Sequence, residues 1–270
     1  MQRLKMQLRL SSKDSKMKLK NKTALITGAS AGIGKECAIK LAKKGTHLVL
    51  LARRAHKLKE LKEKLKKYGV VVNIYAVDVT DYKALEKVAK ELNARDILPN
   101  ILINNAGLSQ GLETIDTADV SDWDRMIDTN LKGVLYVSRL IIPMMKEKKH
   151  AHIVNLGSIA GREVYAGGSV YNATKFGVHA INKAMNIDLF GTNVKVTNVA
   201  PGAVETEFSV VRFHGDKEKA DGVYKGFTPL NAKDVTKSIL FALKQPRHVN
   251  IQEIFLTPTA QRTTYLTYKE

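Results

Sequence analysis

Two residues in the segment SVYNATKFG, at 169–177, can carry out proton chemistry together. Tyr171 and Lys175 stand four positions apart, so on a helix their side chains share one face. A free phenol has a pKa near ~10, too high for an efficient base at neutral pH, and a neighbouring ammonium favours the phenolate. Ser158, upstream in the chain, adds a hydroxyl that can hold a reacting oxygen. The pattern predicts a proton-transfer site built on Tyr171, Lys175 and Ser158.

A glycine-rich turn, TGASAGIG at 27–34, lies between the first predicted strand and the first predicted helix. Gly28, Gly32 and Gly34 allow a tight turn, and the free N–H groups at the start of the helix favour a pyrophosphate. The alternative interpretation is a turn that serves packing only. Its position between strand and helix favours a dinucleotide site.

The end of the second predicted strand indicates which dinucleotide binds. Arg53 and Arg54 stand in LLARR, where an acidic residue would bind a ribose 2′-hydroxyl. Two guanidinium groups suit a 2′-phosphate instead, so we predict NADP(H) rather than NAD(H). The alternative is that both arginines simply open a basic helix. Asp78, after the third strand, can face the adenine or cap the helix that begins near Asp81, and both interpretations stay open.

Apolar runs bounded by turn residues alternate with segments of helical period along the chain. We predict strands at 23–27, 47–52, 71–77, 100–104, 151–156, 194–199 and 253–257, and helices at 32–44, 55–67, 81–92, 119–147, 170–190 and 232–244. Pro143 should end or kink the fourth helix. The alternation predicts a single doubly wound α/β Rossmann domain with a seven-stranded, mainly parallel sheet covered on both faces. We assign it residues 21–270, with a substrate loop at about 203–230, after a basic arm at 1–20 that we expect to be flexible.

A net charge of +18 raises the question of a polyanionic partner. Residues 1–22 carry eight Lys or Arg against one Asp, and residues 53–67 carry eight against two Glu, so these stretches supply +13 of the total. Neither interleaves aromatic residues, and leucines at 58, 61 and 65 make the second an amphipathic helix. No apolar run reaches the roughly 18 residues that span a bilayer. We expect a cytoplasmic protein with no specific nucleic acid, no membrane partner and no metal site, and we interpret the single cysteine, Cys37, as a core residue.

Six ordered motifs together resemble the short-chain dehydrogenase/reductase family. They are TGASAGIG at 27–34, NNAG at 104–107, DTNLKG at 128–133, LGSIAG at 156–161, YNATK at 171–175 and PG at 201–202. The segments at 201–226 and near the C-terminus look like those of the NADP-dependent 3-hydroxy acid dehydrogenases, which act on serine, allo-threonine and related acids. The resemblance covers the chain from about residue 20 onward.

The resemblance implies a set of roles at the matching positions. It implies that Tyr171 is the catalytic base and that Lys175, Ser158 and Asn130 complete the catalytic set. The family counterpart of Asn130 holds a water in a relay to the lysine. The implied cofactor contacts are Gly28, Ser30, Gly32, Ile33, Gly34, Arg53, Arg54, Asp78, Val79, Asn105, Ala106, Gly107, Tyr171, Lys175, Pro201, Gly202, Val204 and Thr206. Thr206 can bind the nicotinamide carboxamide or cap the next helix. The family analogy also implies a homotetramer in which the 119–147 and 170–190 helices pair between subunits.

A 3-hydroxy acid brings a carboxylate, which suits a bidentate guanidinium. Arg162, just after SIAG, and Arg212, in the substrate loop, are the two candidates, and a surface ion pair is the alternative for each. Two rival functions stay open. One is a reductase of 3-ketoacyl thioesters on an acidic carrier protein, or of simple carbonyl compounds, and the other is a non-catalytic NADP-binding or nucleic-acid-associated protein.

Overall fold

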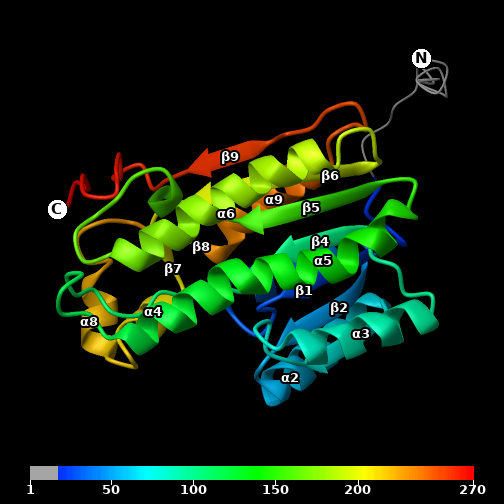
Figure 1. Cartoon of the computed structure of the whole chain (residues 1–270), viewed down its shortest axis with the longest axis horizontal. Helices are drawn as coiled ribbons and strands as arrows, with labels where there is room; N and C mark the ends of the chain where they lie inside the picture. The colour runs from blue at the N-terminus through cyan, green and yellow to red at the C-terminus, as the bar shows by residue number, and fades with distance from the viewer. Residues whose placement is uncertain (1–17) are drawn as a thin grey trace.

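The computed structural model describes residues 18–270, which form a parallel sheet between two layers of helices (Figure 1). The seven strands of the sheet are β1 (Thr23–Thr27), β2 (His47–Ala52), β3 (Val72–Ala76), β4 (Ile101–Asn104), β5 (Ala151–Leu156), β6 (Val194–Pro201) and β9 (Glu253–Leu256). Their order is β3-β2-β1-β4-β5-β6-β9, and every neighbouring pair is parallel. The order reverses between β1 and β4, which is where doubly wound sheets open a ligand crevice. The predicted fold class is confirmed.

One face of the sheet is covered by α1 (Gly32–Ala42), α2 (Ala55–Leu65) and α9 (Ala232–Leu243). Leu58, Leu61 and Leu65 of α2 are buried there, so the lysines of this basic helix face outward, as its pattern predicts. Cys37 is also buried and lies 3.5 Å from the Thr236 hydroxyl, and burial raises the pKa of its thiol to about 12. The cysteine is a core residue.

The opposite face carries α3 (Tyr82–Ala94), α4 (Val120–Ile127), α5 (Gly133–Lys146) and α6 (Ser169–Asp188), which cross in front of the strands in Figure 1. The predicted helix at 119–147 is interrupted by a π-helical turn, η3 (Asp128–Lys132), between α4 and α5. Pro143 lies inside α5, which continues to Lys146, so the proline does not end the helix, and the alternative of a kink stays a prediction. The predicted catalytic residue Asn130 lies in this π-helical turn.

Short elements missed in the sequence complete the chain after β6. They are β7 (Val204–Glu205), α7 (Phe208–Arg212), α8 (Lys217–Gly222) and β8 (Leu230–Asn231). Two 3-10 turns that come before β6, η2 (Lys66–Tyr68) and η4 (Ile159–Gly161), were also missed in the sequence. Strands β7 and β8 pair with each other in a separate small sheet. This pairing closes the substrate loop at its base and brings α7 over the carboxyl end of the main sheet.

The start of the domain differs from the predicted boundary at residue 21. Leu19 is buried in the core beside α1, and its carbonyl accepts a hydrogen bond of 2.9 Å from the Thr46 hydroxyl. The domain therefore includes Leu19, because this side chain packs against the sheet. The rest of the predicted basic arm, residues 1–17, lies outside the described residues. Between 18 and 270, no helix is long and apolar enough to cross a membrane.

Candidate active site

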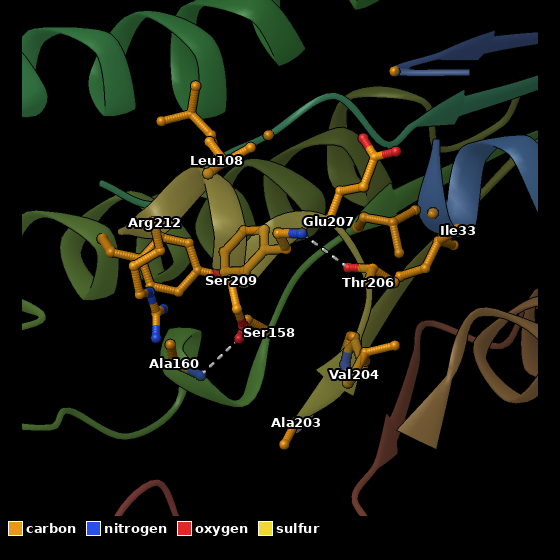
Figure 2. A pocket seen from close by; sticks show the side chains of 18 of the residues that line it. Ile33, Leu108, Ser158, Ala160, Ala203, Val204, Thr206, Glu207, Ser209 and Arg212 are labelled. Atoms are coloured by element: carbon orange, nitrogen blue, oxygen red, sulfur yellow. Dashed lines mark hydrogen bonds between the residues drawn. The ribbon is translucent and has the colours of Figure 1, made fainter. Parts of the chain in front are cut away.

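A cavity of about 660 Å³ opens at the carboxyl ends of β1, β4, β5 and β6. Figure 2 shows side chains from the glycine turn, from the loop after β5 and from α7 converging on it. Three of the four predicted catalytic residues, Tyr171, Lys175 and Ser158, line this cavity. Residues as far apart in the sequence as Gly28 and Lys175 are thus brought to one edge of the sheet, as parallel topology requires.

Tyr171 and Lys175 lie on the buried face of α6. The Lys175 Nζ is 5.8 Å from the centre of the Tyr171 ring and donates a hydrogen bond of 2.9 Å to the Leu156 carbonyl at the end of β5. Burial lowers the pKa of Lys175 to about 8. The Leu156 carbonyl therefore fixes the Lys175 ammonium beneath the phenol. Because the ammonium is buried away from water, its charged form is less favourable and its pKa is lowered.

The pKa of Tyr171 is raised well above its usual range, chiefly by burial and also by the neighbouring Tyr165. Two contacts oppose this rise: the positive charge of Arg212 and a hydrogen bond with Ser158. From the sequence, Lys175 is the residue expected to stabilise the phenolate, and the structure adds Arg212 to that role.

Ser158 follows β5 and begins the turn η4. Its Oγ accepts a hydrogen bond of 3.1 Å from the Ala160 amide, drawn as a dashed line in Figure 2. This bond orients the hydroxyl at the cavity wall, so that its remaining proton and lone pair can face a ligand. The position agrees with the predicted role of holding a reacting oxygen.

Asn130 is buried in the π-turn and does not line the cavity. Its side chain binds both polar groups of the Leu108 backbone, at 2.9 Å to the amide and 2.8 Å to the carbonyl, and donates to the Thr174 hydroxyl at 3.0 Å. These contacts join the loop after β4 to α6, next to Lys175. Geometry gives Asn130 a positioning role, and the water relay stays a prediction.

The glycine turn has the geometry of a phosphate cradle. Gly28 and Gly32 have φ values of +63° and +49°, which side chains rarely adopt. A Cβ on Gly34 would lie 2.5 Å from the side-chain nitrogen of Asn105 and 2.6 Å from the Gly28 carbonyl oxygen. Gly34 therefore packs closely behind the turn, and it does not line the cavity. Helix α1 begins with no side-chain cap on its first amides. Those donors are available to a pyrophosphate, so the residues present fit a dinucleotide.

Arg54 lies at the end of the cavity where the sequence predicts the 2′-phosphate. Its Nε and one terminal nitrogen donate to the Ser30 hydroxyl at 3.3 and 3.2 Å, and the other terminal nitrogen donates to Glu207 at 2.8 Å. Arg53 lies 3.7 Å from the Asp78 carboxylate. Both arginines line the cavity, and Arg54 lies beside a hydroxyl, which suits a phosphate, but each arginine also has an acidic partner.

The two interpretations of Asp78 can now be separated. Asp81 caps α3 by accepting a hydrogen bond of 2.9 Å from the Ala84 amide. Asp78 instead accepts two bonds of 3.0 Å from Thr80 and lines the cavity. The helix cap is thus Asp81, and Asp78 lies where an adenine contact is expected.

The remaining predicted cofactor contacts also lie on the cavity wall. They are Ser30, Gly32, Ile33, Val79, Asn105, Ala106, Gly107, Pro201, Gly202, Val204 and Thr206. Asn105 donates to the Thr27 and Gly28 carbonyls at 2.9 and 3.2 Å and so holds the glycine turn against β4. The Thr206 hydroxyl accepts a hydrogen bond of 3.3 Å from the Phe208 amide, but the N-cap residue of α7 is Glu207, and Thr206 lines the cavity.

Arg212 is the arginine that reaches the cavity. Its guanidinium carbon lies 5.7, 5.5 and 5.3 Å from the ring centres of Tyr165, Tyr171 and Phe208, and one terminal nitrogen donates to the Tyr165 hydroxyl at 2.9 Å. The Nε atom is buried with no hydrogen-bond partner among residues 18–270. A buried unpaired N–H is costly, so this atom is a strong candidate for a ligand contact.

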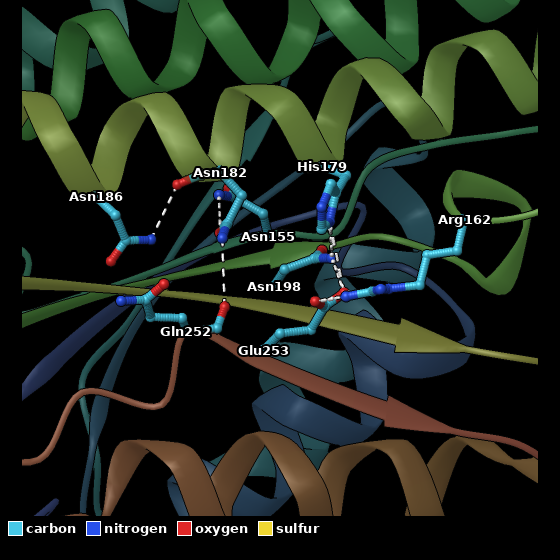
Figure 3. A network of polar contacts seen from close by, with 8 residues as sticks. All are labelled: Asn155, Arg162, His179, Asn182, Asn186, Asn198, Gln252 and Glu253. Atoms are coloured by element: carbon cyan, nitrogen blue, oxygen red, sulfur yellow. Dashed lines mark hydrogen bonds and ion pairs between the residues drawn. The ribbon is translucent and has the colours of Figure 1, made fainter.

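Arg162, in contrast, does not line the cavity, and the structure does not support its predicted role in substrate binding. Its guanidinium forms an ion pair with both carboxylate oxygens of Glu253 (Figure 3), with the Nε bond at 2.9 Å. Asn198 donates to the same carboxylate at 3.0 Å, and His179 lies 3.5 Å away. The side chain is held by β9 on the outer side of the turn that carries Ser158, because Glu253 compensates its charge there.

Several residues of the cavity wall were not identified from the sequence. They are Leu112, Tyr165, Glu207, Phe208, Tyr224, Phe227, Gln261, Thr264, Thr267 and Lys269. Most come from irregular segments after β6 and β9, which have no periodicity to place them. No cluster of three or more metal-binding side chains occurs in the part of the chain that the structure describes.

Comparison with known proteins agrees with this geometry. The family model for short chain dehydrogenases matches residues 22–216. An NADP-dependent 3-hydroxy acid dehydrogenase of Schizosaccharomyces pombe is 42% identical over 246 residues, which is 90% of this chain and 95% of that protein. One of Salmonella typhimurium is 42% identical over 240 residues, which is 88% of this chain and 95% of its own length.

Two solved structures extend the comparison to three dimensions. A closed form of serine dehydrogenase complexed with NADP+ has a TM-score of 0.85 at 40% identity and covers 92% of this chain and 99% of its own. Serine dehydrogenase from Escherichia coli has a TM-score of 0.76 at 36% identity, covering 89% and 99%. These relatives match nearly the whole length of the chain, which also has the fold, the tyrosine–lysine pair and the glycine cradle described above. The chain belongs to the short-chain dehydrogenase family.

Proposed function

We propose that this protein is an NADP-dependent dehydrogenase of small 3-hydroxy acids such as serine or allo-threonine. The observation that supports the acid substrate most directly is Arg212, whose unpaired Nε lies in the cavity wall beside the Tyr171 ring. A guanidinium next to the proton-transfer residue can bind a carboxylate while the hydroxyl two carbons away reaches the phenol. The names of the relatives point to the same substrate class.

The residues of this chain divide the work of the reaction. Arg212 binds the carboxylate, and Ser158 Oγ holds the oxygen of the reacting hydroxyl. Tyr171 takes the hydroxyl proton in oxidation and returns it in reduction. Lys175, fixed by the Leu156 carbonyl, keeps a positive charge beneath the phenol. When bound, the nicotinamide of NADP accepts or supplies the hydride.

The cofactor assignment depends on the far end of the cavity. Arg53 and Arg54 line this end, Arg54 donates to Ser30, and the acidic residue expected of an NAD site is absent from the end of β2. The Gly28–Gly34 cradle holds the pyrophosphate. NADP is the cofactor that this arrangement favours.

The first experiment is a substrate panel with two cofactors. Purified protein is mixed with L-serine, D-serine, L-allo-threonine, D-threonine or 3-hydroxyisobutyrate, and reduced nicotinamide is followed by absorbance with NADP+ and with NAD+. We expect NADP+-dependent turnover of one or more acids that is lost in Tyr171→Phe. No turnover of any acid, with NADPH instead oxidised by acetoacetyl thioesters or simple ketones, would replace the hydroxy-acid assignment with a carbonyl reductase.

We also propose that the protein is a cytoplasmic homotetramer. Large apolar side chains remain exposed on α5 and α6, including Leu135, Phe176 and Ile187, and Phe241 on α9 is exposed near the β9 edge. Such surfaces are usual at subunit contacts. Light scattering coupled to gel filtration should give four times the 29.9 kDa chain mass, and a monomeric mass would refute this part. Fractionation of cells, followed with an antibody to the protein, tests the location.

A further inference from the structure

The ion pair between Arg54 and Glu207 connects the two ends of the cavity. Arg54 follows β2, and Glu207 directly precedes α7, more than a hundred residues later in the chain. With Ser30 accepting from Nε and one terminal nitrogen, and Glu207 accepting from the other, all three guanidinium nitrogens have partners. Figure 2 shows the Glu207 carboxylate directed away from Arg212 and Ser158. The acid thus turns toward the cofactor end of the cavity.

A 2′-phosphate at Arg54 must compete with this carboxylate. Phosphate carries a charge of about −1.5 to −2 and prefers the same donors that Glu207 occupies. The two side chains of the ion pair are about half exposed, so water screens their attraction and a dianion can displace Glu207. A cofactor without the phosphate leaves the pair unchanged. Glu207 therefore interacts differently with the two nicotinamide cofactors.

Displacement of Glu207 also affects the substrate end of the cavity. Glu207 is the residue before the first turn of α7, and Arg212 is the last residue of that helix. The Glu207 carbonyl accepts a hydrogen bond of 3.1 Å from Val211, so the position of residue 207 and that of the helix are linked. Release of the side chain frees the start of α7.

We propose that Glu207 is a specificity residue for the cofactor: it holds Arg54 until a 2′-phosphate replaces it, and the exchange releases α7 for substrate binding. This inference rests on the proposed function, since it requires that NADP binds at Arg54. Glu207, an acidic residue of the substrate loop, would then contact Arg54 when NAD is bound and be displaced from Arg54 when NADP is bound.

The test compares Glu207→Gln with Glu205→Gln by isothermal titration calorimetry with NADP+ and NAD+. Glu205 is an exposed acid of the same loop that does not line the cavity, so its removal changes the charge without the contact. We expect Glu207→Gln to lower the Kd for NADP+ about three- to tenfold and to leave the Kd for NAD+ within about twofold. Glu205→Gln should change both by less than about twofold. In 1 M salt, where the Debye length is about 3 Å, the gain should largely disappear.

Two further measurements separate the possible failures. In an Arg54→Ala background, Glu207→Gln should affect NADP+ binding no more than Glu205→Gln does. Hydrogen exchange of the amides at 208–213 should be faster in cofactor-free Glu207→Gln than in the wild type. Equal Kd values for NADP+ in the two glutamine variants would overturn the inference and leave the proposed function intact. A wild type that binds NADP+ no more tightly than NAD+ would overturn both.

Discussion

Replacement of Arg212 with methionine tests the acid substrate most directly, because methionine keeps much of the side-chain volume and removes the charge. A hydrogen bond to a charged group contributes about 1.5–3 kcal/mol, and a carboxylate can take two from a guanidinium. The combined loss of about 3–6 kcal/mol corresponds to a decrease in kcat/KM of roughly 10²- to 10⁴-fold, since 1.4 kcal/mol is tenfold. The decrease applies to substrates that carry a carboxylate.

A second effect of the same substitution acts on Tyr171. The charge of Arg212 opposes the raised pKa of the phenol, so its removal should raise that pKa further. The pH at which the base becomes active therefore moves to more alkaline values for every substrate. A neutral substrate should show only this second effect.

The assay measures kcat/KM against pH for 3-hydroxyisobutyrate and for its methyl ester. Arg162→Met is the matched control, because Arg162 is bound to Glu253 outside the cavity. We expect Arg212→Met to lose most activity on the acid and far less on the ester, and Arg162→Met to stay within about threefold of the wild type on both. An equal loss on acid and ester would refute the carboxylate contact, even if activity fell strongly.

Three other predictions concern the base, the buried lysine and the glycine cradle. Tyr171→Phe should lower kcat by about 10²-fold or more while the Kd for NADP+ measured by calorimetry changes little, and retained turnover would exclude the phenol as the base. Lys175 has a folded pKa of about 8 against an ordinary 10.5, so its buried charge destabilises the cofactor-free fold below pH 8 and this cost disappears as the pH rises from 8 to 10.5. The free energy of unfolding of Lys175→Met, relative to that of the wild type, should therefore be higher at pH 7 than at pH 10.5, by roughly 3 kcal/mol at most in urea unfolding. A difference between variant and wild type that does not depend on pH would contradict the burial argument. Gly34→Ala should weaken NADP+ binding more than about tenfold and lower the melting temperature, because its Cβ would lie 2.6 Å from the Gly28 carbonyl, whereas Gly222→Ala, with open space around it, should do neither.

The sheet and its main helices could be predicted because five of the seven strands, all except β3 and β9, are largely buried and largely apolar runs between turn residues. The strand β1 matches its predicted range, and β6 begins where predicted and ends at Pro201, just beyond its predicted end. The elements β7 and β8 could not be found, since a strand of two residues has no period to detect. The π-turn at Asn130 also lacks a sequence signal of its own, because its residues fit a continuous helix equally well.

The two candidate arginines show where sequence reasoning about the site reached its limit. Arg162 is closer in the chain to Ser158, yet it faces Glu253, while Arg212 arrives from a distant helix and contacts Tyr171. The direction of each side chain depends on partners that are remote in sequence. Glu207 was overlooked for the same reason, since nothing near it in the chain indicates Arg54.

The state of Cys37 has a practical consequence for following the substrate loop. Its thiol is buried, and a pKa of about 12 keeps it protonated, so thiol-reactive dyes should leave it unmodified in the folded protein. Because the chain has no other cysteine, a single one introduced at exposed Lys219 on α8 would be the only labelled position. Fluorescence or spin labels could then report loop movement in an otherwise unaltered enzyme, without first constructing a cysteine-free background.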